Sequence, residues 1–436
     1  MRLAPRSINR AGLLVGSNNI TLARSRRLDH RQSDYAIRTR HLRTSHDRRT
    51  FLVAATTGLG ALASVDADQP RAPGGERRSY GQRSRSERPQ RELHESKTPG
   101  NGWSYTPLQD LYGTITPSAL HFERHHAGVP HIESGAHTLL LHGAVDRPLV
   151  FTVADLQRLP SVSTVHFIEC AGNSWNEHRG NPGPNPQRTH GLISCSEWTG
   201  VSLKLLLQEA GLEPEAKWVI AEGADACRLA RSIPLDKAVD DVLVAYGQNG
   251  EALRPEQGHP VRLVVPGWEG NTWVKWLHRL QVSDHPSMHR EESAYYTDLM
   301  PGGKARIFTF VMEAKSVITR PAGEQRLEGP GFHEITGIAW SGRGRITRVE
   351  VSTDGGRTWQ DAALQDPILP KALTRFRFPW TWDGQVAILQ SRCTDETGYV
   401  QPTRDRILAV RDIRGTDHYN GIKSWQVQAD GSVISV

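Results

Sequence analysis

The sequence predicts an α+β protein in which a mixed α/β domain, residues 103–317, precedes an all-β sandwich, residues 318–436. In the first domain, short apolar runs are separated by Gly and Pro, and segments 202–210 and 235–246 have the apolar spacing of amphipathic helices. In the second, short strand-like segments and a Gly-rich turn favour a sandwich of about 110 residues. These strand segments are 335–340, 346–351 and 385–390, and the turn is Asp354-Gly355-Gly356.

The composition is that of a globular protein with a substantial core. Of its 436 residues, 37% are hydrophobic and 12 are Trp, which suits about two or three domains. The net charge of +6 arises from residues 1–100, which carry a net +11, whereas the remainder carries a net −5. Because the Arg-rich part lacks interleaved aromatic residues, this charge does not favour nucleic-acid binding. The sequence contains no heptads, no fixed repeat and no segment expected to span a membrane.

Residues 1–63 predict an export signal. The pair Arg48-Arg49 precedes Phe51 and an uncharged run that ends at Ala63, a pattern that resembles the twin-arginine signal. The uncharged run is too short for a transmembrane helix, so we expect a cleaved signal with an N-terminal extension. Twin-arginine export carries proteins that are already folded, which predicts a periplasmic location. An amphipathic surface helix is the alternative interpretation.

Residues 64–102 are predicted to form a disordered linker. They are rich in Arg, Ser, Gly, Pro and Glu and contain few large apolar side chains. Such a segment cannot offset the entropy cost of ordering by burying apolar surface.

Cys170 is the most informative residue of the first domain. It follows an apolar, β-branched run and begins the turn-like sequence Cys-Ala-Gly-Asn. A thiol presented at the end of a strand suits a soft metal ligand or a nucleophile. The nucleophile is the weaker alternative, because no neighbouring residue clearly supplies an orienting base. The chain has no C-x-x-C pair for a c-type haem or an iron–sulfur cluster, and the remaining cysteines are expected to be buried thiols or halves of a disulfide: Cys195, Cys227 and Cys393.

Five segments resemble the sulfite oxidase family in the same order along the chain. They are residues 122–130, 170–173, 191–201, 258–267 and 273–277. The resemblance implies the fold of that family: a sulfite-oxidase-type mixed α/β core that binds molybdenum–molybdopterin, followed by an Ig-like dimerisation domain that forms a homodimer. It also implies that Cys170 is the molybdenum ligand, and a thiolate is the soft anionic ligand that this metal accepts.

The same resemblance implies ten residues that contact the cofactor. Cationic and polar groups suit its phosphate and its ring donors and acceptors. Gln257 stands where the family usually has His, although an amide can still hydrogen-bond to the pterin. A zinc site built from the neighbouring histidines His121, His125, His126 and His131 is the alternative, but their spacing fits no closed tetrahedral site. The implied cofactor-binding residues are Phe122, Arg124, His125, His126, Asp225, Gln257, Arg262, Trp273, Val274 and Lys275.

One departure from the family concerns the substrate pocket. Sulfite oxidases have an Arg two residues after the Asn of Cys-Ala-Gly-Asn, whereas this chain has Trp175. Losing a guanidinium removes charge-assisted hydrogen bonds of roughly 1.5–3 kcal/mol each, so free sulfite is expected to be a poor primary substrate. The resemblance implies that the other catalytic residues are Arg124, Tyr296 and Arg414, with Tyr295 as the alternative to Tyr296.

Residues 169–174 and 191–201 resemble the molybdenum subunits of sulfane dehydrogenases from periplasmic Sox thiosulfate-oxidising systems. This implies oxidation of a sulfane sulfur that a sulfur carrier protein holds as a persulfide on a cysteine. Because the chain has no haem motif, it also implies electron transfer to a diheme c-type cytochrome subunit, within a homodimer or a heterotetramer. The alternatives are a sulfite dehydrogenase that reduces cytochrome c, and a periplasmic molybdenum reductase of sulfoxides, which the Ig-like domain disfavours.

Overall fold

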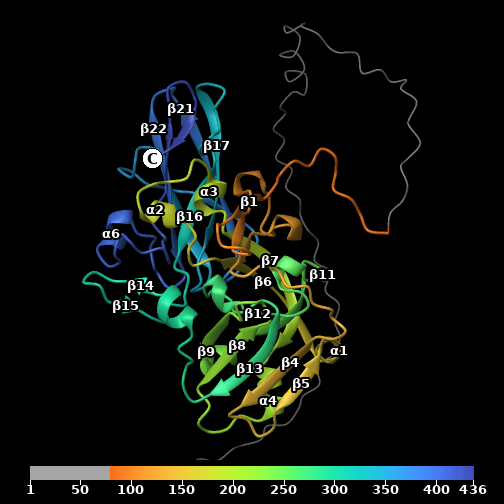
Figure 1. Ribbon diagram of the computed structural model, residues 1–436. Helices are drawn as coiled ribbons and strands as arrows, with labels where there is room; N and C mark the ends of the chain where they lie inside the picture. The colour runs from red at the N-terminus through yellow and green to blue at the C-terminus, as the bar shows by residue number, and fades with distance from the viewer. Residues whose placement is uncertain (1–78) are drawn as a thin grey trace, which may run out of the picture. The chain divides into compact units, whose positions relative to one another are not determined.

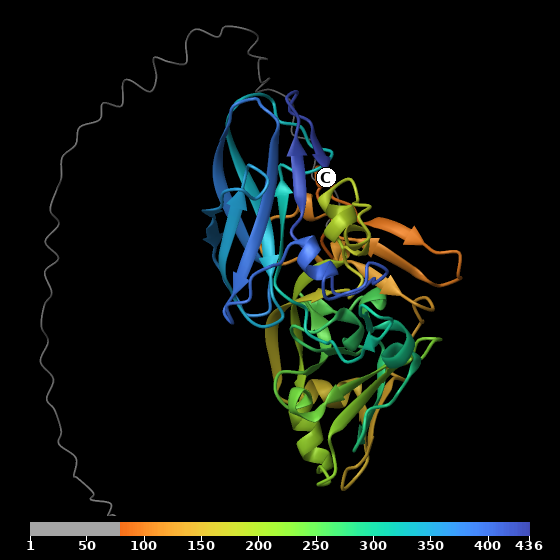
Figure 2. The ribbon, with the colours of Figure 1, turned by 90° about the vertical axis from the view of Figure 1, so that its left-hand side faces the viewer.

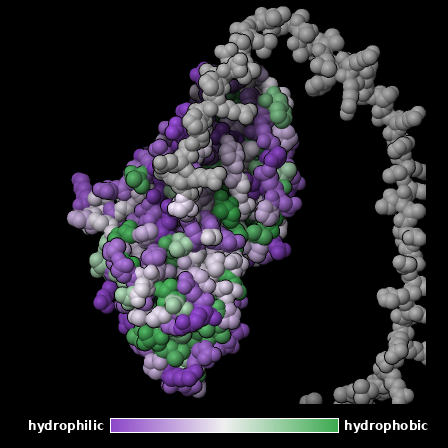
Figure 3. Space-filling model, turned by 90° about the vertical axis from the view of Figure 1, so that its right-hand side faces the viewer, coloured by the Kyte–Doolittle hydropathy of each residue, from purple (hydrophilic) through white to green (hydrophobic). Residues whose placement is uncertain are grey.

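The computed structural model describes residues 79–436 of the chain (Figure 1). The predicted export signal and N-terminal extension, residues 1–63, lie outside the described residues, as does the first part of the predicted linker. Within residues 79–436 the helices are short, and none has the length and hydrophobicity needed to cross a membrane. The space-filling view in Figure 3 shows a largely hydrophilic face, with apolar side chains grouped at the height where Figure 1 places β4 and β5.

A three-stranded antiparallel sheet lies at the start of the described chain. Its strands, in spatial order, are β1 (Glu92–Glu95), β2 (Gly102–Tyr105) and β3 (Glu123–His125). β1 falls inside the predicted disordered linker, so that prediction is wrong at this strand. The strand is held by main-chain pairing with β2 and by the His94 ring, which stacks on Trp103 with centroids 5.6 Å apart. Neither contact requires an apolar run, which is why composition alone did not indicate it.

Two five-stranded sheets form the first domain. One has the order β11-β10-β7-β6 with β12 paired to β10, and the other has the order β5-β4-β13-β8-β9, in which only the β4–β13 pairing is parallel. The strands of the first sheet are β6 (Ser161–Glu169), β7 (Ile193–Ser202), β10 (Leu243–Gln248), β11 (Glu251–Ala252) and β12 (Arg262–Val264). Those of the second are β4 (Thr138–Gly143), β5 (Leu149–Thr152), β8 (Trp218–Gly223), β9 (Ala230–Pro234) and β13 (Leu277–Ser283).

The helix predicted at residues 202–210 is confirmed as α4 (Leu203–Ala210). Its apolar stripe faces the core of the first domain, and burying one leucine contributes roughly 1.5–3 kcal/mol. The helix ends at Gly211, whose φ of 72° suits a residue without a Cβ atom. The buried residues of the stripe are Leu203, Leu206, Leu207 and Ala210.

The helix predicted at residues 235–246 is wrong beyond its first turn. α5 (Leu235–Ala238) is followed by a turn, and the apolar run that comes next forms β10. β10 pairs with β7 as well as with β11 and β12, and all of its side chains are buried except half-buried Tyr246. A short apolar run has the same appearance in a buried helix and in a strand buried on both faces, so periodicity did not separate them.

The second domain consists of two sheets around one hydrophobic core, which confirms the predicted β-sandwich. The sheets have the orders β16-β17-β21-β20 and β19-β18-β22-β23-β24, and Trp340, Phe376 and Leu389 are buried in the core. The predicted boundary at residue 317 falls inside β16, so the sandwich begins at Lys315. Its strands are β16 (Lys315–Arg320), β17 (Gly331–Trp340), β18 (Ile346–Ser352), β19 (Gln360–Asp361), β20 (Ala363–Gln365), β21 (Thr374–Trp382), β22 (Ala387–Asp395), β23 (Ser424–Val427) and β24 (Val433–Ser435).

The two domains meet around the turn that follows β6. Figures 1 and 2 show the short helices α2 (Trp175–His178) and α6 (Arg404–Leu408) close together beside the sandwich. Arg404 donates hydrogen bonds to the carbonyls of Glu177 (3.1 Å) and His178 (3.0 Å) at the C-terminal end of α2. These bonds satisfy carbonyls that a helix end leaves free, so the second domain fixes α2. The remaining α-helices and strands are α1 (Val153–Arg158), α3 (Pro186–His190), β14 (Asp298–Leu299) and β15 (Ala305–Arg306).

Candidate active site

Cys170 follows the last residue of β6 and is presented by a tight turn, as its sequence context predicted. Its N–H donates to the carbonyl of Leu192 (3.0 Å), and its carbonyl accepts from the N–H of Asn173 (2.9 Å). The Asn173 side chain closes the turn, because its amide donates to the carbonyl of His190 (3.0 Å) and its oxygen accepts from Leu192 N–H (3.2 Å). The sulfur is thereby held at the wall of two chambers that meet beside it.

Glu169, the residue before Cys170, is tied to the second domain. Its carboxylate is fully buried and accepts hydrogen bonds from Lys315 Nζ (3.0 Å) and Trp340 Nε1 (2.7 Å). Lys315 lies on β16 and Trp340 on β17, so two strands of the sandwich hold the segment that carries the cysteine. Asn173 Nδ2 donates to the same carboxylate (2.9 Å).

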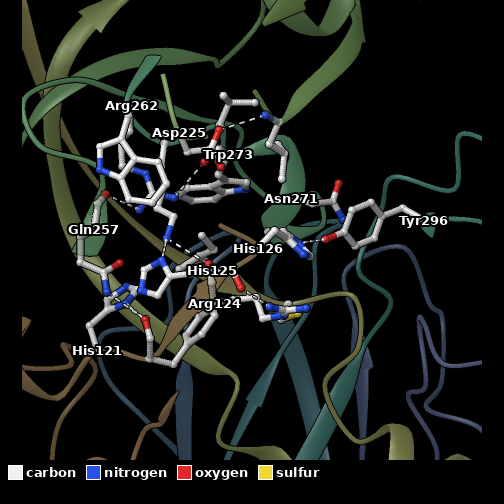
Figure 4. Close-up of a pocket in the computed structure, with 18 residues that line it drawn as sticks. His121, Arg124, His125, His126, Asp225, Gln257, Arg262, Asn271, Trp273 and Tyr296 are labelled. Carbon is white, nitrogen blue, oxygen red and sulfur yellow. Dashed lines mark hydrogen bonds between the residues drawn. The ribbon is translucent and has the colours of Figure 1, made fainter. Parts of the chain in front are cut away.

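The inner chamber borders Cys170, and Figure 4 shows the side chains that line it. The structure brings all ten predicted cofactor-binding residues to its wall. Sequence reasoning missed two polar or aromatic lining residues, Asn271 and Trp276, although each lies within two residues of a matched position. His121, which the sequence grouped with the histidines around the first matched segment, also lines the wall.

Arg262 is a buried cation whose guanidinium faces main-chain carbonyls and the rings of Trp198 and Trp273. It is 1% exposed, and it donates to the carbonyls of Gln257 (2.9 Å) and Trp273 (3.1 Å). Within the described residues no carboxylate lies within 4.0 Å of it, and burial lowers the pKa of Arg262 to about 9. A buried charge without a counter-ion is unfavourable unless an anion joins it, so the chamber suits a phosphate.

Lys275 is a second cation in the same wall, and it is half-buried. Its Nζ donates to the carbonyls of Arg124 (3.0 Å) and Glu256 (3.1 Å) and lies 2.9 Å from His125 Nδ1. Burial, reinforced by the nearby Arg262 charge, lowers the pKa of Lys275 to about 7. An anionic ligand would favour the charged form of this side chain.

Polar atoms in the wall of the inner chamber also lack partners within the described residues. The His121 Nε2 atom and the Asn271 Oδ1 atom are buried without a hydrogen bond, although buried polar groups are normally paired. Burial lowers the pKa of His121 to about 3, so its ring is neutral. These atoms fit a ligand that brings its own donors and acceptors, as a pterin does. Gln257 is different, because its Nε2 donates to the Phe122 carbonyl (2.9 Å) and braces the wall.

The environment of Cys170 fits a metal ligand better than a nucleophile. Burial raises the pKa of its thiol to about 11, and Arg124 opposes this shift without reversing it. A thiol in such surroundings becomes a thiolate when a compensating cation binds beside it, which is what a metal provides. The cysteine, the cations Arg262 and Lys275 and the unpartnered polar atoms together fit a metal cofactor with an anionic tail.

The outer chamber also borders Cys170, and five Trp or Tyr side chains belong to its wall. Trp175, the first residue of α2, lines it, and the Arg179 guanidinium sits over the Trp175 ring at 5.1 Å. Ser174 has a φ of 67°, which turns the chain from the cysteine loop into α2. Arg124 is the only Lys or Arg among the described lining residues, which are Trp103, Tyr105, Arg124, His126, Cys170, Gly172, Trp175, Leu192, Ala294, Tyr295, Tyr296, Thr416 and Asp417.

The structure distinguishes the two adjacent tyrosines. Tyr296 lines both chambers and is buried, and its hydroxyl lies 2.7 Å from His126 Nε2. Tyr295 lines only the outer chamber and is 54% exposed. Burial, together with the Arg124 and Lys275 charges, lowers the pKa of His126 to about 3, so its ring is neutral. A neutral ring can either accept a hydrogen bond from the Tyr296 hydroxyl or donate one to it. Tyr296 is therefore the tyrosine placed at the junction of the chambers.

The prediction that Arg414 belongs to the pocket is wrong. Its side chain is 70% exposed and forms a local ion pair with Asp412 (2.9 Å), and it lines neither chamber. The loop reaches the outer chamber two residues later, at Thr416 and Asp417. Short-range pairing holds the Arg414 guanidinium outside, which a motif match could not reveal.

Comparison with protein families divides the described chain in the same way as the fold does. Residues 126–291 match the oxidoreductase molybdopterin binding domain, and residues 306–422 match the Mo-co oxidoreductase dimerisation domain. Sulfite oxidase from Gallus gallus is 33% identical over 331 residues, which cover 69% of this chain and 70% of that protein. The NADH nitrate reductase from Ulva prolifera is 32% identical over 62% of this chain, but the chain spans only 34% of that longer protein.

A solved structure is similar over most of the described residues. The crystal structure of the sulfane dehydrogenase SoxCD from Paracoccus pantotrophus matches with 48% sequence identity and a TM-score of 0.82, covering 85% of this chain and 98% of that chain. With a molybdopterin domain, a dimerisation domain and a chamber that fits the cofactor, the chain belongs to the sulfite oxidase family of molybdenum–molybdopterin oxidoreductases.

Proposed function

We propose that the protein is the molybdenum subunit of a periplasmic sulfane dehydrogenase. Its substrate is a sulfane sulfur held as a persulfide on a cysteine of a sulfur carrier protein, and its electrons pass to a c-type cytochrome. The observation that carries the proposal is Trp175 in the wall of the outer chamber, at the position where sulfite oxidases have an Arg. The 48% identity to a sulfane dehydrogenase supports the same assignment.

The charge of the outer chamber favours a tethered sulfur over free sulfite. Arg124 is the one cationic side chain of its described wall, and its guanidinium already donates to Asn101 Oδ1 (2.6 Å). A small dianion is normally held by several charge-assisted hydrogen bonds, which this wall does not offer. A sulfur attached to a carrier obtains its binding free energy from the protein–protein contact and needs no arginine cage.

We infer the cofactor contacts of this chain's own residues from the lining of the inner chamber. Cys170 would provide the thiolate ligand of the molybdenum, while Arg262 and Lys275 would hold the phosphate of the pterin tail. His121 Nε2 and Asn271 Oδ1, both unpartnered and buried, would pair with polar groups of the pterin. When bound, the cofactor supplies two-electron transfer of an oxygen atom that derives from water.

The overall reaction balances as three additions of water-derived oxygen to one sulfur. The terminal sulfur of the carrier persulfide, R–S–S⁻, and three waters give the S-sulfonate R–S–SO₃⁻, six protons and six electrons. Arg124 lies at the junction of the chambers, where it stabilises negative charge that develops on the sulfur-bound oxygens. If His126 Nε2 carries the ring proton and donates to the Tyr296 oxygen, the phenol proton is free to donate to the same oxygens.

The proposed assembly follows from the second domain and from the lack of a haem motif in the sequence. The sandwich would form a homodimer, as its match to a dimerisation domain suggests. A diheme c-type cytochrome subunit would accept electrons one at a time and complete a heterotetramer. Export by the twin-arginine pathway would deliver the folded, cofactor-containing protein to the periplasm.

A cytochrome c reduction assay tests the proposal. Purified molybdenum-loaded protein with its cytochrome subunit is given the persulfide-loaded carrier, the same carrier with its cysteine alkylated, or free sulfite. We expect turnover with the loaded carrier and none with the alkylated one. Fast turnover of sulfite without any carrier would instead show a sulfite dehydrogenase. The 33% identity to a sulfite oxidase supports this alternative.

A further inference from the structure

A carboxylate from the second domain lines the outer chamber beside the cysteine. Asp417 lies on the loop between α6 and β23. A Cβ atom placed on Gly172 would lie 3.8 Å from Asp417 Oδ1 and 4.0 Å from Cys170 Sγ. The carboxylate and the sulfur therefore border the same small volume.

No cation neutralises this carboxylate within the described residues. Asp417 forms no ion pair within 4.0 Å, and its side chain accepts one hydrogen bond, from Thr416 Oγ1 at 3.3 Å. Burial raises the pKa of Asp417 to about 6, with the adjacent His418 opposing the shift, so the group is ionised at neutral pH. A lone negative charge in a substrate chamber acts on every anion that enters it.

Contacts of the next residue, His418, hold the backbone that carries Asp417 beside the cysteine loop. The N–H of His418 donates to the carbonyl of Ala171 (2.8 Å), next to the cysteine. The His418 ring lies between the buried carboxylates of Asp298 (2.9 Å) and Glu269 (3.2 Å). This charged cluster raises the pKa of His418 to about 10, which keeps the ring protonated and the contact intact.

We propose that Asp417 is a specificity-determining residue, whose negative charge excludes free inorganic anions such as sulfite and sulfate from the outer chamber. A small dianion meets the full repulsion, and Arg124 is the one cationic side chain of the described wall that can offset it. A sulfur delivered on a carrier enters with at most one negative charge, and the carrier's docking contacts offset the repulsion. In this last respect the inference rests on the proposed function.

The test measures anion binding without turnover. The molybdenum-loaded protein is titrated with sulfate, or with uncharged dimethyl sulfone of similar shape, and binding is followed by tryptophan fluorescence, since Trp103 and Trp175 line the chamber. In Asp417→Asn we expect sulfate to bind about tenfold more tightly, whereas dimethyl sulfone binds as in the wild type. The Asp417→Glu variant keeps the negative charge and should bind sulfate as weakly as the wild type does. Asp430→Asn, the same charge change at a side chain that is 57% exposed and lies outside the chamber, is the control.

Turnover gives a second readout. The kcat/KM for sulfite should rise by about the same factor in Asp417→Asn, mostly through a lower KM. Unchanged sulfate affinity in Asp417→Asn, or an equal gain for sulfate and dimethyl sulfone, would overturn the inference, because neither result is an effect of charge. The sulfate affinity does not depend on what the enzyme oxidises, so this failure is distinguishable from a failure of the proposed function.

Discussion

Lys315 of the second domain neutralises Glu169, the residue that precedes Cys170 in the first. The ammonium and the carboxylate are 3.0 Å apart, and both side chains are at most 1% exposed. Breaking a buried ion pair from one side leaves an uncompensated charge in the interior. The contact therefore couples the sandwich to the segment that holds the metal ligand.

Replacing Lys315 by Met should lower the free energy of unfolding by about 3–5 kcal/mol, because Glu169 keeps its charge and its hydrogen bonds from Trp340 and Asn173 but has no cation beside it. Urea denaturation of the purified protein measures this change. The additional substitution Glu169→Gln should recover part of the loss. The matched control is Arg326→Met at the exposed Arg326–Asp430 pair, which should cost less than about 1 kcal/mol. An equal cost for the two single variants would contradict the account.

Lys275 predicts a specific pH dependence for the cofactor-free protein. Its folded-state pKa is lowered to about 7, whereas an unfolded lysine has a pKa of about 10.4. Between these values the unfolded chain binds more protons, so the free energy of unfolding should rise with pH. Urea denaturation between about pH 7 and pH 9 measures this slope. The Lys275→Met variant should show a smaller slope, whereas Lys204→Met, on the exposed face of α4, should keep the wild-type slope. Identical slopes in the wild type and both variants would refute the lowered pKa of Lys275.

Trp175→Arg should convert the outer chamber toward sulfite oxidation. A guanidinium at this position restores hydrogen bonds of roughly 1.5–3 kcal/mol each, so kcat/KM for sulfite should rise about tenfold or more. Steady-state cytochrome c reduction measures the change. Trp175→Gln removes the ring without adding charge and should leave sulfite turnover low. If both variants gain equally, the ring is only a steric barrier and the charge argument is wrong.

Tyr296→Phe and Tyr295→Phe form a matched pair at the junction of the chambers. The Tyr296→Phe variant should lose roughly a hundredfold in kcat, because His126 positions the Tyr296 hydroxyl to donate to a sulfur-bound oxygen that gains negative charge. Tyr295, which is 54% exposed, should lose less than about threefold. Steady-state kinetics with the loaded carrier measures both variants. The opposite order of effects would reassign the catalytic tyrosine to Tyr295.

Local patterns predicted the parts of the site that lie close together in sequence. The apolar run before Cys170 and the turn residues after it specify a strand and a presented thiol, which the structure confirms. The spacing of leucines specified α4 for the same reason. Motif resemblance added the residues that line the inner chamber.

Contacts between distant segments were not predictable from the sequence. Lys315 meets Glu169 across 146 positions, and Asp417 reaches Gly172 from the second domain. Arg414 shows the converse, because a motif match placed it in the pocket while its local pairing with Asp412 holds it outside. Such placements depend on how the two domains pack, which no periodicity in the chain encodes.

Counting the electrons released from each sulfur decides whether this molybdenum enzyme oxidises carrier-bound sulfane sulfur. A known amount of persulfide-loaded carrier is exhausted with excess cytochrome c, and the reduced cytochrome is measured per sulfane sulfur. We expect six electrons per sulfur and an S-sulfonate on the carrier cysteine. No cytochrome reduction by the carrier, with two electrons released from each free sulfite, would contradict it and identify a sulfite dehydrogenase.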